Sequence, residues 1–298
     1  MLGKSFLALN EFTKTEIASV LELASKLKEE QKNGNAKSPL VGKTLAMIFQ
    51  HPSNRTRLSF EVGMHQLGGS SINIRPDEVQ LGLREPIKDV ARVMSRFVDA
   101  VMLRVAKHTD LLEFANYSSV PVINGLSDLH HPCQAVADLL TIQEHKGELK
   151  NLKVSYIGDG SNVCNSLIHA CSLFDLEISV ACPKGFEPTL DKAYDKLEVT
   201  HEPDKGIKNA DVVYTDVWTS MGQEEEKERR LKKFKGYTIN KELFHLAKHD
   251  AIFMHCLPAH RGEEVTDDIV EHPRSVVFDQ AENRLHAQKA ILVKLLKS

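Results

Sequence analysis

Short apolar runs and longer amphipathic stretches alternate along the first half of the chain. Residues 12–31 carry apolar side chains at three- and four-residue spacings, which predicts a helix. Apolar runs then predict strands at residues 43–49, 70–74, 100–103 and 120–123, with amphipathic helices between them. Strands that alternate with helices usually pair in parallel, so this pattern favours an α/β fold.

The alternation restarts after a helix that we expect from Pro132 to about Lys146. Further strands are predicted near residues 154–157, 177–181, 212–215, 251–255 and 276–278, and a final helix near residues 282–296. We therefore predict two doubly wound parallel-sheet α/β domains joined by helices. The expected boundaries are residues 1–147, residues 148–281, and a C-terminal helix at residues 282–298.

Composition narrows the class of protein. At 298 residues the chain is long enough for two domains, and 42% hydrophobic with 27% charged residues is typical of a soluble globular protein. A net charge of −3 gives no reason to expect nucleic acid or an anionic membrane as a partner. No run approaches the roughly 20 apolar residues of a membrane span, and no signal peptide is evident. The cysteines are five, scattered and without paired spacing, which indicates reduced thiols and a cytoplasmic location.

The segment between the first strand and the next helix concentrates polar chemistry. Residues 51–61 read His-Pro-Ser-Asn-Arg-Thr-Arg-Leu-Ser-Phe-Glu, which places two arginines and two hydroxyl groups in the first turn of a helix. A helix N-terminus presents backbone N–H groups and partial positive charge, so this turn is suited to bind phosphate. The plainer alternative is an ordinary cap made by Ser53 or Thr56, with both arginines in solvent.

Two further polar side chains follow strands of the same predicted sheet. Arg104 follows the strand at residues 100–103, and His131 follows the strand at residues 120–123. Ligands of parallel sheets bind at the carboxyl ends of the strands. We therefore expect residues 53–57, Arg104 and His131 to lie at one edge of the sheet.

The second half contains a glycine-containing turn that resembles a dinucleotide fingerprint only superficially. Residues 158–161 read Gly-Asp-Gly-Ser after a strand, but Val163 stands at the third glycine position. The next strand ends without the carboxylate that would bind a ribose. A nicotinamide-dependent oxidoreductase is thus the weaker interpretation.

Two other strands of the second half end on side chains with recognisable chemistry. Asp216 and Ser220 supply a carboxylate and a hydroxyl group, which can bind an ammonium group, although both residues are also common in loops. His255 and Cys256 end another strand, where a buried thiol is the plainer interpretation. A zinc site made by His255, Cys256 and His260, with or without His130 and His131, lacks the usual paired ligand spacing.

Four of these motifs, in this order, resemble the aspartate and ornithine carbamoyltransferase family over essentially the whole chain. Residues 53–57 are similar to the carbamoyl-phosphate motif Ser-Thr-Arg-Thr-Arg, with Asn54 in place of threonine. Asn162 matches the second asparagine of a Gly-Asp-x-Asn-Asn stretch, with Ser161 as a departure. Residues 216–222 match Asp-x-Trp-x-Ser-Met-Gly, and residues 255–258 read His-Cys-Leu-Pro. Both motifs are typical of the ornithine branch.

The resemblance implies a reaction and a site. The expected activity is transfer of a carbamoyl group from carbamoyl phosphate to the δ-amine of ornithine, giving citrulline in arginine biosynthesis, with no metal or organic cofactor. The residues implied to bind carbamoyl phosphate are Ser53, Asn54, Arg55, Thr56, Gln80, Arg104, His131, Gln134, Cys256, Leu257 and Arg284. Those implied to bind ornithine are Asn162, Asp216, Ser220 and Met221. Those implied to act in catalysis are Cys256, Arg55, Arg104, His131 and Asp216.

The resemblance also implies an assembly and leaves alternatives open. The family forms trimers, so a homotrimer or a multiple of trimers is expected, with Gln80 reaching the phosphate site of a neighbouring subunit. The C-terminal helix is expected to pack on the first domain. One alternative is a carbamoyltransferase for another amine, such as putrescine or an acylated ornithine. Another is a non-catalytic relative that binds carbamoyl phosphate, which the presence of Arg55, Arg104, His131 and Cys256 disfavours.

Overall fold

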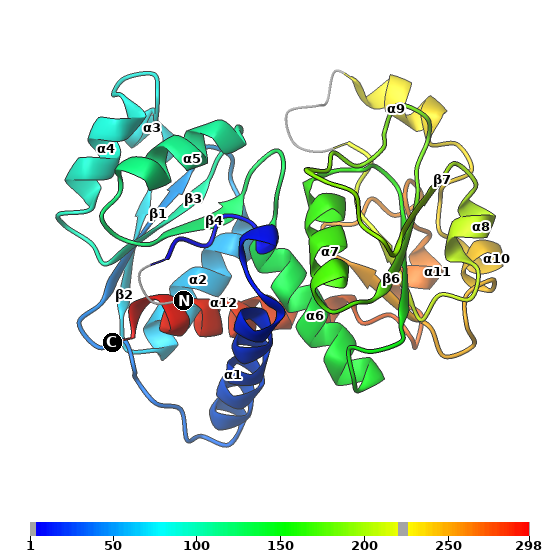
Figure 1. Ribbon diagram of the computed structural model, residues 1–298, viewed down its shortest axis with the longest axis horizontal. Coiled ribbons are helices and arrows are strands. Elements are labelled where there is room, and N and C mark those ends of the chain that lie inside the picture. The colour runs from blue at the N-terminus through cyan, green and yellow to red at the C-terminus, as the bar shows by residue number, and fades with distance from the viewer. Residues whose placement is uncertain (1–3, 220–225, 298) are drawn as a thin grey trace. The chain divides into compact units, whose positions relative to one another are not determined.

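The structure is a computed structural model that describes residues 4–219 and 226–297 (Figure 1). Internal contacts divide the chain into two compact units. Unit 1 comprises Met1–Leu140 and Glu282–Ser298, and unit 2 comprises Thr141–Ala281. Each unit contains one parallel β-sheet with helices, so the predicted fold class is confirmed.

Unit 1 is built on a four-stranded sheet in the order β2-β1-β3-β4, and every pair of strands is parallel. Its strands are β1 (Thr44–Phe49), β2 (Ser70–Ile74), β3 (Ala100–Arg104) and β4 (Val122–Leu126). Its helices are η1 (Leu9–Glu11), α1 (Lys14–Lys32), α2 (Asn54–Gln66), α3 (Pro76–Val79), α4 (Ile87–Met94) and α5 (His108–Tyr117). The first part of α6 (Pro132–Lys146) and the later part of α12 (Val277–Leu296) also belong to this unit.

Burial explains why these segments form a sheet covered on both faces. The central strands β1 and β3 are almost continuously buried, whereas the edge strand β2 is largely exposed. Ala46 and Ile48 of β1 pack in one apolar cluster with residues of α4 and α5. Figure 1 shows α4 and α5 over one face of this sheet and α2 on the other. At the start of α1, Thr13 and Glu16 form a reciprocal cap, which explains where that helix begins.

Unit 2 has a five-stranded parallel sheet in the order β7-β6-β5-β8-β9. Its strands are β5 (Lys153–Ile157), β6 (Glu177–Ala181), β7 (Leu197–Thr200), β8 (Val212–Thr215) and β9 (Ile252–His255). Its helices are α7 (Asn162–Leu173), α8 (Pro203–Ile207), α9 (Lys227–Lys233), α10 (Lys241–Phe244) and α11 (Asp267–Val270), together with the last part of α6 and the beginning of α12.

Two sequence-based expectations for this unit were wrong. The pattern missed β7, because this edge strand is short and largely exposed and lacks an apolar run. Residues 276–278 are not a strand: the N–H of Val276 bonds to Phe253, but α12 begins at Val277. A short apolar run fits either a strand or a helix start, and here the N–H of Gln280 already donates to the carbonyl of Val276.

In both sheets the chain order reverses beside the first strand of the unit. The reversal lies between β1 and β3 in unit 1 and between β5 and β8 in unit 2. Loops that follow such strand pairs diverge and leave room for a ligand at the carboxyl edge. None of the helices in the described parts of the chain is long and apolar enough to cross a membrane.

Candidate active site

In unit 1, the loop after β1 leads directly into α2. Ser53 has an extended backbone and caps α2, because its Oγ accepts from the N–H of Thr56 at 3.4 Å. The cap that the plainer alternative predicts is therefore present, but the arginines are not both in open solvent. The cap does not preclude anion binding, because the Ser53 hydroxyl keeps its own proton to donate. Arg55 is half-buried in the same turn, whereas Arg57 lies 3.9 Å from the carboxylate of Glu61.

Arg104 lies beside this loop. It ends β3, where it is in register with Phe49 at the end of β1. The backbone carbonyl of Arg104 accepts from the N–H of Gln50 at 2.8 Å, and the Gln50 side chain accepts from the N–H of Ala106 at 2.7 Å. The loop between β1 and α2 and the end of β3 are thus fixed to each other at the point where the chain order reverses.

His131 precedes α6 and is buried, with only 5% of its surface exposed. Burial lowers the pKa of its imidazole well below the ordinary value, and the positive charges of Arg284 and Arg104 lower the pKa further. The ring is therefore neutral at neutral pH. A neutral imidazole can donate one hydrogen bond, for example to a carbonyl oxygen, without adding a charge.

A buried guanidinium group joins α12, α2 and α6 in unit 1. Arg284 is 4% exposed, and its Nη2 donates to the Thr56 hydroxyl at 3.2 Å. Its Nη1 donates to Oε1 of Gln134 at 2.8 Å, while Nε2 of Gln134 donates to Asp138 at 2.8 Å. One of the two lone pairs of the Gln134 oxygen therefore already accepts from Arg284.

The predicted residues in the first turn of α2, together with the four that lie on β3, α6 and α12 or just before α6, make up what we call the first-unit site. Its residues are Ser53, Asn54, Arg55, Thr56, Arg104, His131, Gln134 and Arg284. Gln80, the remaining predicted unit 1 residue, lies between α3 and α4 with an exposed side chain and a backbone φ of 43°. Its carbonyl accepts from the N–H groups of Leu83 and Arg84, which closes a tight surface loop.

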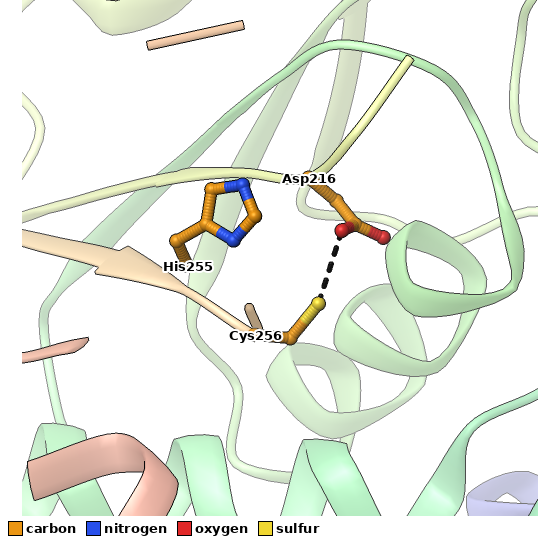
Figure 2. Close-up of side chains that lie close together, drawn as sticks. All are labelled: Asp216, His255 and Cys256. Atoms are coloured by element: carbon orange, nitrogen blue, oxygen red, sulfur yellow. Dashed lines mark hydrogen bonds between the residues drawn. The ribbon is translucent and has the colours of Figure 1, made fainter. Parts of the chain in front are cut away.

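In unit 2, β8 and β9 are neighbours, and a carboxylate and a thiol follow their ends. Thr215 pairs with His255, so Asp216 and Cys256 leave the sheet side by side. The Sγ of Cys256 donates to Oδ1 of Asp216 at 3.0 Å, as Figure 2 shows. The same oxygen accepts from the N–H of Val217 at 2.8 Å, and Asp216 is 7% exposed. These bonds hold a largely buried carboxylate in one orientation.

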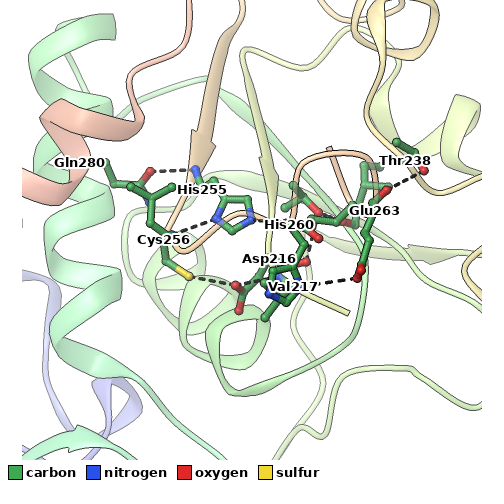
Figure 3. Close-up of polar contacts among 12 residues, drawn as sticks. Asp216, Val217, Thr238, His255, Cys256, His260, Glu263 and Gln280 are labelled. Atoms are coloured by element: carbon green, nitrogen blue, oxygen red, sulfur yellow. Dashed lines mark hydrogen bonds and ion pairs between the residues drawn. The ribbon is translucent and has the colours of Figure 1, made fainter. Parts of the chain in front are cut away.

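His255 supports the segment that carries Cys256. Its Nδ1 lies 2.9 Å from the N–H of Leu257, which can only donate, so Nδ1 is the acceptor nitrogen. The Nε2–H group therefore donates to Oε1 of Glu264 at 3.1 Å, and both side chains are fully buried. The backbone N–H of His255 also donates to Gln280 at 2.9 Å, a contact visible in Figure 3.

These hydrogen bonds bear on the zinc alternative. Asp216, His255 and Cys256 present possible ligand atoms within 4.8 Å of one another. Both ring nitrogens of His255 already have hydrogen-bond partners, however, so metal binding there would break one of those bonds. His260 groups instead with Glu263 and Glu264. The geometry therefore fits a hydrogen-bonded acid and thiol better than a metal centre.

Asn162 lies at the start of α7, after the loop that follows β5. In this loop a side chain at Gly160 would collide with the backbone of Glu187 and Pro188, so the close approach requires glycine. Thr215 donates from its hydroxyl to the carbonyl of Ile157 at 2.6 Å, which joins the ends of β5 and β8. Asn162, Asp216, His255 and Cys256 form what we call the second-unit site. Ser220 and Met221 lie outside the described residues, and their predicted roles stay predictions.

Sequence reasoning missed one residue beside this site. Arg230 belongs to the densely charged helix α9 (Lys227–Lys233), yet it is only 8% exposed. Its Nη1 bonds to Asp159 at 2.6 Å and to the carbonyl of Trp218 at 2.8 Å, and its guanidinium lies 5.1 Å from the ring centre of Phe186. Burial raises the pKa of Asp159, and Arg230 opposes that rise. Nothing in a run of charges distinguishes this arginine from its neighbours.

Comparison with known families covers nearly the whole chain. The model of the aspartate/ornithine carbamoyltransferase carbamoyl-P binding domain matches residues 4–144, and that of the Asp/Orn binding domain matches residues 150–295. The chain belongs to the aspartate/ornithine carbamoyltransferase family.

Relatives within this family resemble the chain along its full length. An ornithine carbamoyltransferase of Archaeoglobus fulgidus is 54% identical over 299 residues, which cover 98% of this chain and 97% of the relative. An anabolic ornithine carbamoyltransferase of Pyrococcus furiosus is 51% identical over 306 residues, covering 99% and 97%. The solved structure of a Pyrococcus furiosus ornithine carbamoyltransferase matches with a TM-score of 0.95, 51% identity and coverage of 99% and 97%.

Proposed function

We propose that the chain is an ornithine carbamoyltransferase, which transfers the carbamoyl group of carbamoyl phosphate to the δ-amine of L-ornithine and releases L-citrulline and phosphate. The observation that carries the proposal is the buried Asp216, fixed by Cys256 in a segment whose residues match the ornithine branch. A carboxylate suits a cationic amino acid. An aspartate substrate would instead need cationic partners for its second carboxylate.

The first-unit site fits the carbamoyl donor. Attack on an acyl phosphate needs a clamp on the leaving phosphate and donors directed at the carbonyl oxygen. Ser53, Asn54, Arg55 and Thr56, with Arg104, would bind the phosphate, because they combine a helix N-terminus with two guanidinium groups. The neutral imidazole of His131 suits the carbonyl oxygen, because it donates a hydrogen bond without attracting the phosphate.

Gln134 and Leu257 would bind the carbamoyl NH2 group. The second lone pair of the Gln134 oxygen remains for this bond, since Arg284 uses only one. The N–H of Leu257 is engaged by His255, so the carbonyl of Leu257 is its suitable acceptor. Arg284 would act close to the carbamoyl group through Gln134 and Thr56.

The second-unit site fits the acceptor. Asn162, Asp216, Ser220 and the backbone of Met221 would bind the α-amino and α-carboxylate groups of ornithine. The δ-nitrogen then forms a bond to the carbonyl carbon, the bond from that carbon to the phosphate oxygen breaks, and the nitrogen loses a proton. Because the δ-amine is protonated in water, a group must take up its proton. The pair of Cys256 and Asp216 is our candidate: the sulfur takes a proton from the nitrogen as the thiol passes its own proton to the Asp216 carboxylate.

We extend the proposal to domain roles and assembly. Residues 1–147 would bind carbamoyl phosphate, residues 148–281 would bind ornithine, and residues 282–298 would complete the first domain. The exposed Gln80 loop is suited to reach a neighbouring subunit, so we propose a cytoplasmic homotrimer or a multiple of it. The anabolic name of the Pyrococcus furiosus relative supports a role in arginine biosynthesis.

An assay with competing acceptors tests the proposal. Purified protein is given carbamoyl phosphate with ornithine, putrescine or aspartate, and the carbamoylated products are separated and quantified. We expect citrulline from ornithine at a kcat/KM at least about a hundredfold above that for either other acceptor, a preference of roughly 2.7 kcal/mol. Preferential carbamoylation of putrescine or aspartate, or no product from any acceptor, would overturn it.

A further inference from the structure

Gln288 of α12 makes two hydrogen bonds in unit 1. One is to Arg284 of the first-unit site, and the other is to Ser59, which in turn bonds to the backbone of Arg55. The Gln288 side chain is completely buried and lies one helical turn after Arg284. Its Oε1 accepts from Nε of Arg284 at 2.9 Å, and its Nε2 donates to Oγ of Ser59 at 2.8 Å. A guanidinium N–H can only donate, so the orientation of the Gln288 amide is fixed by its partners.

Ser59 passes this connection to the first turn of α2. Its hydroxyl donates to the backbone carbonyl of Arg55 at 2.6 Å, with a longer contact of 3.1 Å to the carbonyl of Thr56. Because Ser59 accepts from Gln288 while donating to Arg55, all hydrogen bonds run in one direction. They lead from Arg284 through Gln288 and Ser59 to Arg55.

We propose that Gln288 is a positioning residue for carbamoyl phosphate. It holds the guanidinium plane of Arg284 and, through Ser59, the turn of α2 that carries Arg55 and Thr56. Three groups, Gln288, Gln134 and Thr56, then fix the guanidinium from three sides. A planar guanidinium held in this way does not first have to be ordered when a ligand binds beside it.

The neutrality of Gln288 is part of the proposal. A glutamate of the same shape would accept from Arg284, but it would also neutralise positive charge next to a phosphate site. Its two oxygens could not donate to Ser59, so the Ser59 hydroxyl would turn towards the carboxylate and leave the Arg55 carbonyl. The amide orients both arginine segments and leaves their charge available to an anion.

The inference rests on the proposed function, and its test begins with the wild-type protein. KM values for carbamoyl phosphate and ornithine are measured with citrulline formation as the readout. Binding of phosphonoacetamide, a stable analogue of carbamoyl phosphate, is measured directly without ornithine. A wild-type protein that neither forms citrulline nor binds the analogue overturns the proposed function itself.

The decisive variant is Gln288→Met, which keeps the length of the side chain but removes both hydrogen bonds. We expect KM for carbamoyl phosphate and Kd for the analogue to rise about tenfold, with KM for ornithine changed less than about twofold. The matched control is Lys289→Met. Lys289 is the next residue and equally buried, and its Nζ makes two hydrogen bonds, to Gln66 at 2.9 Å and to Gln31 at 3.4 Å.

The control separates positioning from a merely structural role. Both variants are expected to lower Tm, but Lys289→Met should leave KM for carbamoyl phosphate within about twofold of the wild-type value. Suppose that the wild type is active and that Gln288→Met lowers only Tm or the active fraction, as Lys289→Met does. This result would overturn the inference and leave the proposed function intact.

Two further variants test the chain of hydrogen bonds, and the milder one, Ser59→Ala, can be measured even if Gln288→Met folds poorly. Gln288→Glu should raise KM for carbamoyl phosphate more than Gln288→Met does, because it adds negative charge. Ser59→Ala removes a single hydroxyl and should raise the same KM about threefold. The double variant with Gln288→Met should cost little more than Gln288→Met alone, because both changes break one pathway. Full multiplication of the two single effects would show that the residues act separately and would overturn the inference.

Discussion

The first-unit and second-unit sites occupy the same position in two similar sheets, yet they carry opposite charge. Both lie at the carboxyl edge of a sheet. The first includes the ends of β1 and β3, between which strand order reverses, and the second includes the ends of β5, β8 and β9, with the reversal between β5 and β8. The first gathers arginines and a neutral imidazole, whereas the second has Asp216 and Cys256. Topology thus determines where a ligand binds, and the side chains after each strand determine which charge it has.

The two sites also differ in how their groups are held. Arg284 reaches Thr56 and Gln134 across 228 and 150 positions of the chain, so the first-unit site depends on packing between distant helices. Asp216 and Cys256 follow neighbouring strands, and the hydrogen bonds that hold them come from the same segments. Disturbing helix packing should therefore affect the first site more, whereas a change of charge should be most harmful in the second.

The largest expected effect is that of Asp216→Asn. It removes the charge proposed to pair with the substrate ammonium, so we expect kcat/KM for ornithine to fall about a thousandfold, or about 4 kcal/mol. Kd for phosphonoacetamide should change less than about threefold, because the first-unit site keeps its charge. Steady-state kinetics and direct titration measure the two quantities.

The control for this change lies at the other end of β8. Asp211 is also buried, accepts from the N–H of Lys153 at 2.9 Å and forms an ion pair with Lys248 at 2.8 Å. Asp211→Asn should lower stability and leave kcat/KM for ornithine within about threefold. Near-normal ornithine kinetics in Asp216→Asn would remove this residue from the proposed site.

The second-largest expected effect concerns the neighbouring subunit that the first-unit site is proposed to need. Arg55→Ala removes a phosphate ligand, and Gln80→Ala removes the side chain proposed to reach a neighbour, so each variant should lose at least about a hundredfold in activity. When the two proteins are dissociated and reassembled together, some interfaces pair an intact Arg55 with an intact Gln80. Citrulline formation by the mixture should then exceed the sum of the parents.

Verified mixed assemblies without such recovery would mean that each subunit builds its site alone. A mixture of Arg55→Ala with Asp216→Asn sharpens the comparison further. The two changes affect the first-unit site and the second-unit site. This mixture therefore tests whether Arg55 and Asp216 must belong to the same subunit. We expect citrulline formation no greater than the sum of the parents, because no subunit in this mixture has both an intact Arg55 and an intact Asp216.

The sequence predicted the positions of these sites better than it predicted the contacts that hold their side chains in place. Periodic apolar runs indicated parallel sheets, and parallel sheets bring their strand ends to one edge, so Arg104 and Asp216 could be placed without a structure. The buried position of Arg230 and the connection from Gln288 to Ser59 could not. These contacts join residues 71 and 229 positions apart, and no local pattern specifies which of several polar side chains in a helix is buried. The strand β7 was missed because an exposed edge strand has no apolar run.

The third expected effect concerns pH, and it follows from the lowered pKa of the buried His131. Below pH 6.5 an unfolded histidine takes up a proton that the folded His131 does not, so the free energy of unfolding should fall as the pH falls. The loss attributable to this residue is at most about 1.4 kcal/mol per pH unit, or about 2 kcal/mol between pH 6.5 and 5.

Urea unfolding at pH 7.5 and 5.0 measures this loss. His131→Asn cannot take up the proton in either state, so the difference in unfolding free energy between the two pH values should become smaller. His65→Asn is the control, because His65 is an exposed residue of α2. An unchanged pH dependence in His131→Asn would show that the imidazole is not kept neutral by burial.

The smallest expected effect is that of Asn54→Thr, which restores the residue usual in the family. Asn54 is exposed at the first position of α2, where any residue other than proline presents a backbone N–H towards the helix N-terminus. Both side chains can donate a hydrogen bond, so KM for carbamoyl phosphate should change less than about tenfold, or about 1.4 kcal/mol. If the backbone N–H makes the main contact, Asn54→Ala should stay within the same limit. An improvement of a hundredfold in Asn54→Thr would instead show that the natural site is impaired, and that the charge of the arginines does not by itself determine phosphate binding in the first unit.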